Sequence, residues 1–238
     1  MKITRFAVTL ILAVFISTSC IYTGPSLRGN GNVVEENRKV GNFQEIIVSR
    51  GMNVYISQGD ITKVMVKADE NLLDAIETRM EGDALKITST TNIRSATVKK
   101  VFVTIPDIES MKTSSGSNVY SESVITSKSL DLSSSAGSNL KLEVQTGKLE
   151  TSVSAGSNIK LEGITDQFYG KASSGSNLKA EDLTTDNCEV KVSSGANIWI
   201  TVREDLQAQA TSGGNIFYYG NPEFTDIEKS SGGNVIKK

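Results

Sequence analysis

The residues of this chain that could do chemistry are mainly carboxylates. The sequence contains 27 Asp and Glu residues but no histidine, and its only cysteines are Cys20 and Cys188. Histidine-dependent triads, imidazole acid-base catalysis and His-containing zinc sites are therefore excluded, and two cysteines are too few for a thiolate metal site. Any active site would have to be built from carboxylates.

Four aspartates are the candidates for such carboxylate chemistry. They fall where loops would close successive repeats of the chain: Asp166, Asp182, Asp186 and Asp205. Parallel β-helices include polysaccharide hydrolases and lyases built on Asp clusters, yet loop acids are usually turn formers and solvating charges. The Asp-rich nonapeptide spacing of calcium-binding repeats is also missing. We therefore expect no enzyme, no cofactor and no metal site.

A second group of candidate residues is apolar and lies near the C-terminus. When the repeats are aligned, one outward column holds lysine in three repeats and an apolar residue in the next three. An apolar column in place of a charged one favours a binding surface for a sugar or a protein. The alternatives are self-association, or cover by residues 221–224. The predicted surface comprises Trp199, Phe217, Tyr219 and Ile236.

The element that must position these residues is a repeat of Gly-x-Asn followed by an aliphatic residue. Successive asparagines of the repeat are 21, 19, 19, 20, 18 and 19 residues apart. A period near 19 predicts a parallel β-helix with one solenoid coil per repeat, most regular at 113–238. Weaker copies start at Gly51 and Gly31. The seven regular copies are centred on Asn118, Asn139, Asn158, Asn177, Asn197, Asn215 and Asn234.

Within each coil the residues alternate with the period of two that a strand imposes. The residue after each asparagine and the one two positions later are aliphatic and should face the core. Between them, lysine and then glutamate face outward as ladders of opposite charge, which is typical of a solvated surface. A second inward column should hold Leu130, Leu149, Phe168, Cys188 and Leu206, so that Cys188 acts as a small buried hydrophobe.

The residues that recur in every repeat are expected to have structural roles. Parallel coils place asparagine on asparagine, so we predict an inward-facing ladder of side-chain amides along the solenoid axis. The glycine should supply the bend at positive φ. A column of hydroxyl residues, from Ser114 to Ser230, precedes the glycine by two positions.

The segment from 32 to 110 is less regular. Strand-like runs occur at residues 33–40, 43–48, 53–57, 64–68, 85–89 and 98–105, and residues 71–80 are consistent with a short helix. We expect these elements to begin the solenoid and to cover its N-terminal end, because an open sheet edge promotes aggregation.

The N-terminus has the features of a secretory signal over residues 1–19. Lys2 and Arg5 precede an apolar run at 6–16, which is shorter than the about 20 residues of a membrane span. Cys20 then follows three small residues, as in the lipobox of bacterial lipoproteins, although plain cleavage after Ser19 is an alternative. We expect residues 20–30 to be a tether whose acylated Cys20 holds the protein on a membrane. The net charge of -2 gives no reason to expect nucleic acid.

Three segments outside the regular coils add to the pattern. They are Gly29-Asn30-Gly31-Asn32-Val33, Val40-Gly41-Asn42-Phe43 with Ile46, and Val54-Tyr55-Ile56. With these segments and the coils, the chain resembles the auto-transporter adhesins with a head GIN domain, which are common among Bacteroidetes. The resemblance implies a right-handed parallel β-helix over 31–238 and a role in adhesion at the cell envelope. No export domain follows the last coil in this sequence, so a lipid anchor would take over attachment.

Three hypotheses of function follow. The first is an exported, outer-membrane-anchored adhesin or binding module, in the periplasm or at the cell surface, whose partner is a glycan or an envelope protein. The second is a structural envelope component without a ligand. The third and weakest is a carbohydrate-active enzyme that would use Asp182 or Asp205.

Overall fold

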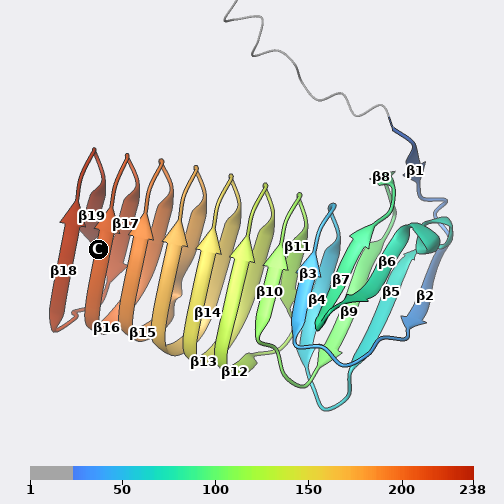
Figure 1. Cartoon of the computed structure of the whole chain (residues 1–238), viewed down its shortest axis with the longest axis horizontal. Helices are drawn as coiled ribbons and strands as arrows, with labels where there is room; N and C mark the ends of the chain where they lie inside the picture. The colour runs from blue at the N-terminus through green and yellow to red at the C-terminus, as the bar shows by residue number, and fades with distance from the viewer. Residues whose placement is uncertain (1–23) are drawn as a thin grey trace, which may run out of the picture.

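The protein is a flattened β-solenoid in which coils stack along one axis. The computed structural model describes residues 24–238. Figure 1 shows the stacked coils, each with a sharp turn at the top of the view and a rounder bend at the bottom. The coil strands are β10 (Ser110–Thr113), β11 (Asn118–Ser121), β12 (Ile125–Ser134), β13 (Asn139–Val153), β14 (Asn158–Ala172), β15 (Asn177–Val192), β16 (Asn197–Ala210), β17 (Asn215–Tyr219), β18 (Phe224–Lys229) and β19 (Asn234–Lys237).

The predicted parallel coils of about 19 residues are confirmed. From β10 to β19 the neighbouring strands pair in parallel, and the register places Asn139 beside Asn158 and Asn158 beside Asn177. The expected alternation also holds, since residues of β13 are alternately buried and exposed along its first half. Equivalent aliphatic residues of successive coils therefore form a continuous core.

The sharp turns are two-residue turns with both central residues at positive φ. Ala155 and Gly156, for example, have φ of 50° and 70°, and the N–H of Ser157 donates to the carbonyl of Ser154 at 3.2 Å. This is the geometry of a type I′ turn, which normally favours Asn-Gly. Positive φ was predicted for the glycine but is also adopted by the preceding serine or alanine. The N–H of Gly137 donates to the Ala155 carbonyl at 3.0 Å, which links one turn to the next.

The N-terminal region departs from the simple winding of the coils. Strands β3 (Glu45–Val48) and β4 (Asn53–Gln58) form one coil that lies between the β10–β11 coil on one side and β7 (Ala84–Ser89) and β9 (Lys99–Ile105) on the other. Beyond them lie β2 (Val33–Arg38), β5 (Lys63–Asp69) and β6 (Ile76–Glu81). Their pairing is antiparallel: β2 pairs with β5, β5 with β9, and β6 with β7. This meander covers the N-terminal end of the core (Figure 1).

The helix suggested for residues 71–80 is only partly correct. A short 3₁₀ segment, η2, spans Glu70–Ala75, and the rest of the range is strand β6. Leu72 and Ala75 are the buried residues of η2, so the segment closes the core with about two turns of 3₁₀ helix. The chain must then extend at once, because β6 pairs with β7 from Ile76 onward.

The first described residues are fixed to the domain by a buried carboxylate. Strand β1 (Ser26–Arg28) pairs in parallel with β8 (Asn92–Ser95). Asp69 is fully buried and accepts backbone N–H bonds from Gly31, Thr97 and Val98 at 3.2, 3.2 and 3.0 Å. A Cβ at Gly29 would overlap this carboxylate. The range expected to be a tether thus includes a strand and a clamped segment.

Candidate functional site

The predicted aromatic surface lies on the outward face of the last three coils. The rings of Trp199 on β16 and Phe217 on β17 stack with centroids 5.3 Å apart and planes inclined by 16°. Ile236 on β19 pairs with Phe217 in register and is 40% exposed, and Tyr219 lies two residues after Phe217 on the same face. The four residues form one partly exposed apolar patch, which we call the distal stack.

The segment after β17 and the last two lysines lie near the distal stack, and they decide whether the patch is covered. Residues 221–224 lead from β17 into β18, and Phe224 at the end of this segment is itself 71% exposed. Asn221 accepts a hydrogen bond from the Lys237 ammonium at 2.7 Å. The Lys238 ammonium lies 5.3 Å from the centre of the Phe217 ring. The patch therefore combines half-buried rings with a cation at one end.

A second group of stacked rings was missed by the sequence analysis. Tyr55 on β4 lies between Phe102 on β9 and Tyr120 on β11, with ring centroids 5.2 and 5.3 Å away. The Lys100 ammonium lies 4.8 Å from the Tyr55 centroid. We call Phe102, Tyr55 and Tyr120 the proximal stack. Part of it was visible in the sequence, since Tyr55 and Tyr120 both stand two residues after the motif asparagine.

The proximal and distal stacks belong to one outward column. The strand register runs without a gap from one stack to the other through three lysines. Since neighbouring strands are about 4.8 Å apart, Tyr120 and Trp199 are about 19 Å apart along the axis. In order, the column holds Phe102, Tyr55, Tyr120, Lys141, Lys160, Lys179, Trp199, Phe217 and Ile236.

The lysines in the middle of the column are largely neutralised by neighbouring acids. The Lys160 ammonium lies 2.9 Å from Glu162 and 3.2 Å from Asp182, and Lys141 lies 3.7 Å from Glu162. Hydrogen bonds to Glu162 and Asp182 raise the pKa of Lys160, and the bond from Lys160 lowers the pKa of Glu162. Both partners therefore stay charged at neutral pH, and two of the three lysines in the middle of the column are paired with acids, whereas Lys179 has no ion pair in residues 24–238.

The rings of both stacks present their edges to solvent. A centroid spacing of 5.2–5.3 Å, close to the strand spacing, means that each ring lies above its neighbour along the axis. Most ring faces are consequently in contact with another ring. Ring edges, the hydroxyls of Tyr55 and Tyr120, and the indole N–H donor of Trp199 are the groups offered to a partner.

The asparagines of the repeat form a chain of side-chain hydrogen bonds. Each amide nitrogen donates to the amide oxygen of the preceding coil at 2.8–3.0 Å, beginning with Asn118 bonded to Asn53. Asn53 in turn donates to the Lys99 carbonyl at 3.2 Å. The predicted ladder residues Asn118, Asn139, Asn158, Asn177, Asn197, Asn215 and Asn234 thus occupy consecutive rungs.

The inward orientation expected for these asparagines is wrong. They are half-buried in most coils, whereas the residue before the asparagine is fully buried in every coil but the last, as Ser138 and Ser176 show. The Ser176 hydroxyl donates to the carbonyls of Ser173 and Val153 at 2.7 and 2.9 Å, which closes the turn from inside. The asparagine therefore shares the outward face with the column of rings and lysines.

The four aspartates considered for catalysis are not gathered into one site. Asp182 pairs with Lys160, and Asp186 lies 3.4 Å from the Arg203 guanidinium. Asp205 lies in register with Asn187, and the Asp166 carbonyl accepts from Thr185. Within residues 24–238, no three acidic or cysteine side chains are grouped to hold a metal ion.

Cys188 occupies the buried position that the repeat predicts. Its side chain is 4% exposed, and burial, with a smaller contribution from Glu189, raises the pKa of its thiol. The thiolate is therefore disfavoured, and the residue packs as a small apolar side chain. Cys20, the predicted acylation site, lies outside the described residues. No helix within 24–238 has the length and apolarity needed to span a membrane.

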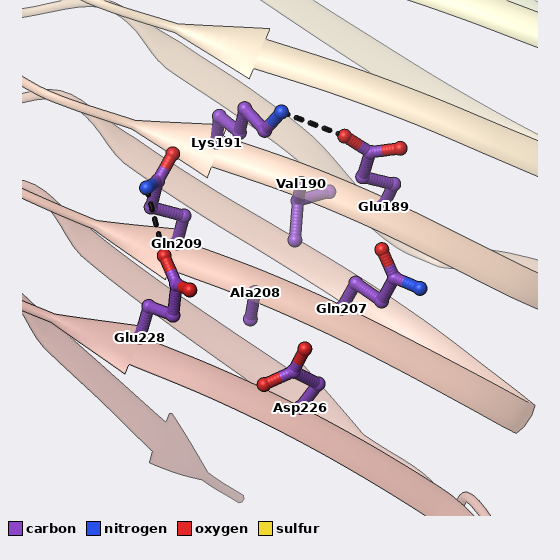
Figure 2. Close-up of a pocket in the computed structure, with 8 residues that line it drawn as sticks. All are labelled: Glu189, Val190, Lys191, Gln207, Ala208, Gln209, Asp226 and Glu228. Carbon is purple, nitrogen blue, oxygen red and sulfur yellow. Dashed lines mark hydrogen bonds and ion pairs between the residues drawn. The ribbon is translucent and has the colours of Figure 1, made fainter.

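A shallow hollow on the opposite sheet of the solenoid is a weaker candidate. Figure 2 shows its polar rim above Val190 and Ala208. The Lys191 ammonium lies 2.8 Å from Glu189, and Gln209 donates to Glu228 at 2.9 Å. These side chains satisfy one another, as expected for a solvated face, so the outward column remains the better candidate.

Comparison with known proteins supports the fold described above. A solved "putative adhesin" from Bacteroides fragilis NCTC 9343 is 19% identical, with a TM-score of 0.82 over 89% of this chain and 100% of its own. A "putative lipid binding protein" from Parabacteroides distasonis ATCC 8503 is 21% identical, with a TM-score of 0.73 over 90% of this chain and 100% of its own. A search of curated proteins gave no match.

The family itself is identified by a sequence model. The model described as "Putative auto-transporter adhesin, head GIN domain" matches residues 42–222, which is more than half of the chain. The match includes the β3–β4 coil, most of the N-terminal meander and the Gly-x-Asn coils through β17. The chain therefore belongs to the head GIN domain family of auto-transporter adhesins.

Proposed function

We propose that this protein is an adhesin of the cell envelope that binds a glycan or an envelope protein through the distal stack. The observation that carries the proposal is the partly exposed apolar patch of the distal stack. Trp199, Phe217 and Ile236 stand where the three preceding coils carry lysine, and Tyr219 lies beside them on the same face. Exposed rings that interrupt a charged column are typical of binding surfaces. The family description as adhesins and the absence of a gathered carboxylate site in residues 24–238 favour binding over catalysis.

We further propose that acylated Cys20 anchors the domain to the outer membrane. Cys20 precedes strand β1 by only six residues, which span at most about 20 Å when fully extended. The clamp around Asp69 would then hold the N-terminal end of the solenoid near the membrane and place the distal stack at the far end. Radiolabelled palmitate incorporation that is lost on Cys20→Ser tests the anchor, and equal labelling of the variant would contradict it.

The binding proposal is tested by a screen of the chain from Ile21 to Lys238, which contains every described residue. The screen uses immobilised glycans and solubilised envelope proteins. We expect a retained ligand that is lost when Trp199 is replaced by alanine and kept when Tyr169 is replaced. Tyr169 is a matched control because it is partly exposed on the opposite sheet, beside Lys148. If wild type retains nothing, a structural envelope role without a ligand becomes the better explanation.

A further inference from the structure

We propose that the proximal and distal stacks form one track for an extended, uncharged polysaccharide chain that lies along the solenoid axis. This inference rests on the proposed binding function and names the class of ligand. It adds a second contact region to that function. This region is the proximal stack, which lies about 19 Å from the distal stack.

The alignment of the two stacks is the first argument. Both lie in the same outward column, so a straight partner can contact Phe102, Tyr55 and Tyr120 at one end and Trp199 and Phe217 at the other. The column from Phe102 to Ile236 is about 38 Å long at the usual strand spacing. A mono- or disaccharide could engage only one stack, whereas a polymer engages both.

The charge of the column is the second argument. Lys141 and Lys160 are paired with Glu162 and Asp182, and the neighbouring outward column adds Glu122 and Glu143. Lys179 has no ion pair in residues 24–238, and Lys100 and Lys238 lie beside the two stacks, but between the stacks the four acids match the three lysines. An anionic polymer would therefore meet no net positive field in the middle of the column. Paired charges instead offer donors and acceptors to the hydroxyls of an uncharged sugar.

The groups along the track are the third argument. The half-buried Asn ladder runs directly beside the column, and its amides belong to the same face. Ring edges and tyrosine or indole polar groups lie at the two ends of the track, lysine and glutamate side chains lie between them, and the asparagine amides run beside the column. This mixture of apolar edges and hydrogen-bonding groups matches the C–H and O–H surface of a glycan chain.

The test is a binding comparison with two matched double variants of the chain from Ile21 to Lys238. One replaces Tyr55 and Tyr120 with threonine, and the other replaces Trp199 and Phe217 with threonine, because threonine removes the ring while favouring the strand. Tyr169→Thr is the control on the opposite sheet. The probes are uncharged polymers (glucomannan, mannan, galactan and laminarin), their short oligosaccharides, and alginate as an anionic polymer. Thermal unfolding and circular dichroism verify that each variant is folded.

We expect wild type to bind at least one uncharged polymer and either double variant to bind it about 100-fold more weakly, because two linked contacts give avidity. Oligosaccharides too short to reach from one stack to the other should bind through one stack only, so their affinity should fall in one double variant and not in the other.

Four outcomes overturn the inference. If only the Trp199 and Phe217 variant loses binding, the proposal of a continuous track is wrong while the proposed function stands. The same holds if wild type retains an envelope protein but no polymer. If alginate binds best and is released by salt, the ligand class is wrong. If wild type binds neither glycans nor envelope proteins, the proposed function fails together with the inference.

Discussion

The N-terminal end and the regular coils achieve order in different ways. At the N-terminal end, single contacts without a copy hold the chain, above all the Asp69 carboxylate with its three backbone donors. In the coils, every contact is repeated about every 19 residues, as in the asparagine ladder and the type I′ turns. Replacing a unique contact should therefore affect a whole element, whereas replacing a repeated one removes one rung and leaves its neighbours partly intact.

The largest effect is expected at Asp69. Replacement by alanine leaves the N–H groups of Gly31, Thr97 and Val98 without their acceptor in a buried site, and each unpaired donor costs about 1–3 kcal/mol. We expect Asp69→Ala to lower the free energy of unfolding by about 3 kcal/mol or more, measured by urea denaturation. Asp74→Ala, on the exposed side of η2, is the matched control and should have little effect. Equal losses for the two variants would contradict a unique role for the clamp.

The same carboxylate predicts a pH dependence. Burial tends to raise the pKa of Asp69, but the backbone N–H donors of Val98, Thr97 and Gly31 outweigh it and lower the pKa below its ordinary value. The folded state therefore binds the proton less readily than the unfolded state, and the stabilisation is complete above the ordinary value of about 3.9. It is lost as the pH falls below that value through the lower folded-state pKa.

Hydrogen exchange of the Thr97 and Val98 amides measures this dependence. We expect their protection to fall below about pH 4, while amides in the β13–β15 coils keep theirs. Asp69→Asn should remove the pH dependence of the difference between the two regions. Uniform loss of protection over the whole chain would show that acid acts elsewhere.

An intermediate effect is expected in the asparagine ladder. Asn177 donates to Asn158 and accepts from Asn197, both at 3.0 Å, whereas Asn234 at the last coil is joined to the ladder through Asn215 alone. We expect Asn177→Leu to cost about 2 kcal/mol and Asn234→Leu about half as much, measured by thermal unfolding. If the ladder hydrogen bonds contributed nothing, Asn177→Leu and Asn234→Leu would lower the free energy of unfolding by the same amount.

The smallest effect is expected at the turns, and it is stabilising. Ala155 is exposed and has φ of 50°, a conformation that costs a non-glycine residue about 1 kcal/mol and that asparagine tolerates better. We expect Ala155→Asn to raise the free energy of unfolding by up to about 1 kcal/mol. Ala172→Asn, in the buried core of β14, should destabilise instead. A destabilising Ala155→Asn would show that the small side chain at the turn is required for another reason.

The same division explains what could be predicted from the sequence. The coils, their register and the buried place of Cys188 follow from the period of the repeat, since each coil reports on the others. The meander of β2, β5 and β6 has no period. The β6–β7 hairpin is local, but the antiparallel pairing of β2 with β5 and of β5 with β9 depends on contacts between distant residues.

The candidate site divides in the same way. The distal stack was found because Trp199 and Phe217 interrupt an aligned column of lysines. The proximal stack was missed for two reasons. Phe102 stands two residues after Lys100, where the motif would have an asparagine, and β4 lies between β9 and β11, out of chain order. The inward orientation of asparagine failed because the turn moves the buried position to the preceding serine.

The turn tips have a consequence for how this protein can change. Because each turn tip is linked by a backbone hydrogen bond to the tip of the next coil, and every coil repeats this link, a whole coil can be duplicated or deleted while its new neighbours form the same link. Each such event lengthens or shortens the interval between the two aromatic stacks by one strand spacing, about 4.8 Å. The number of lysine-bearing coils thus sets the distance between the two stacks, and gene duplication can change that distance in steps while the stacks themselves stay the same.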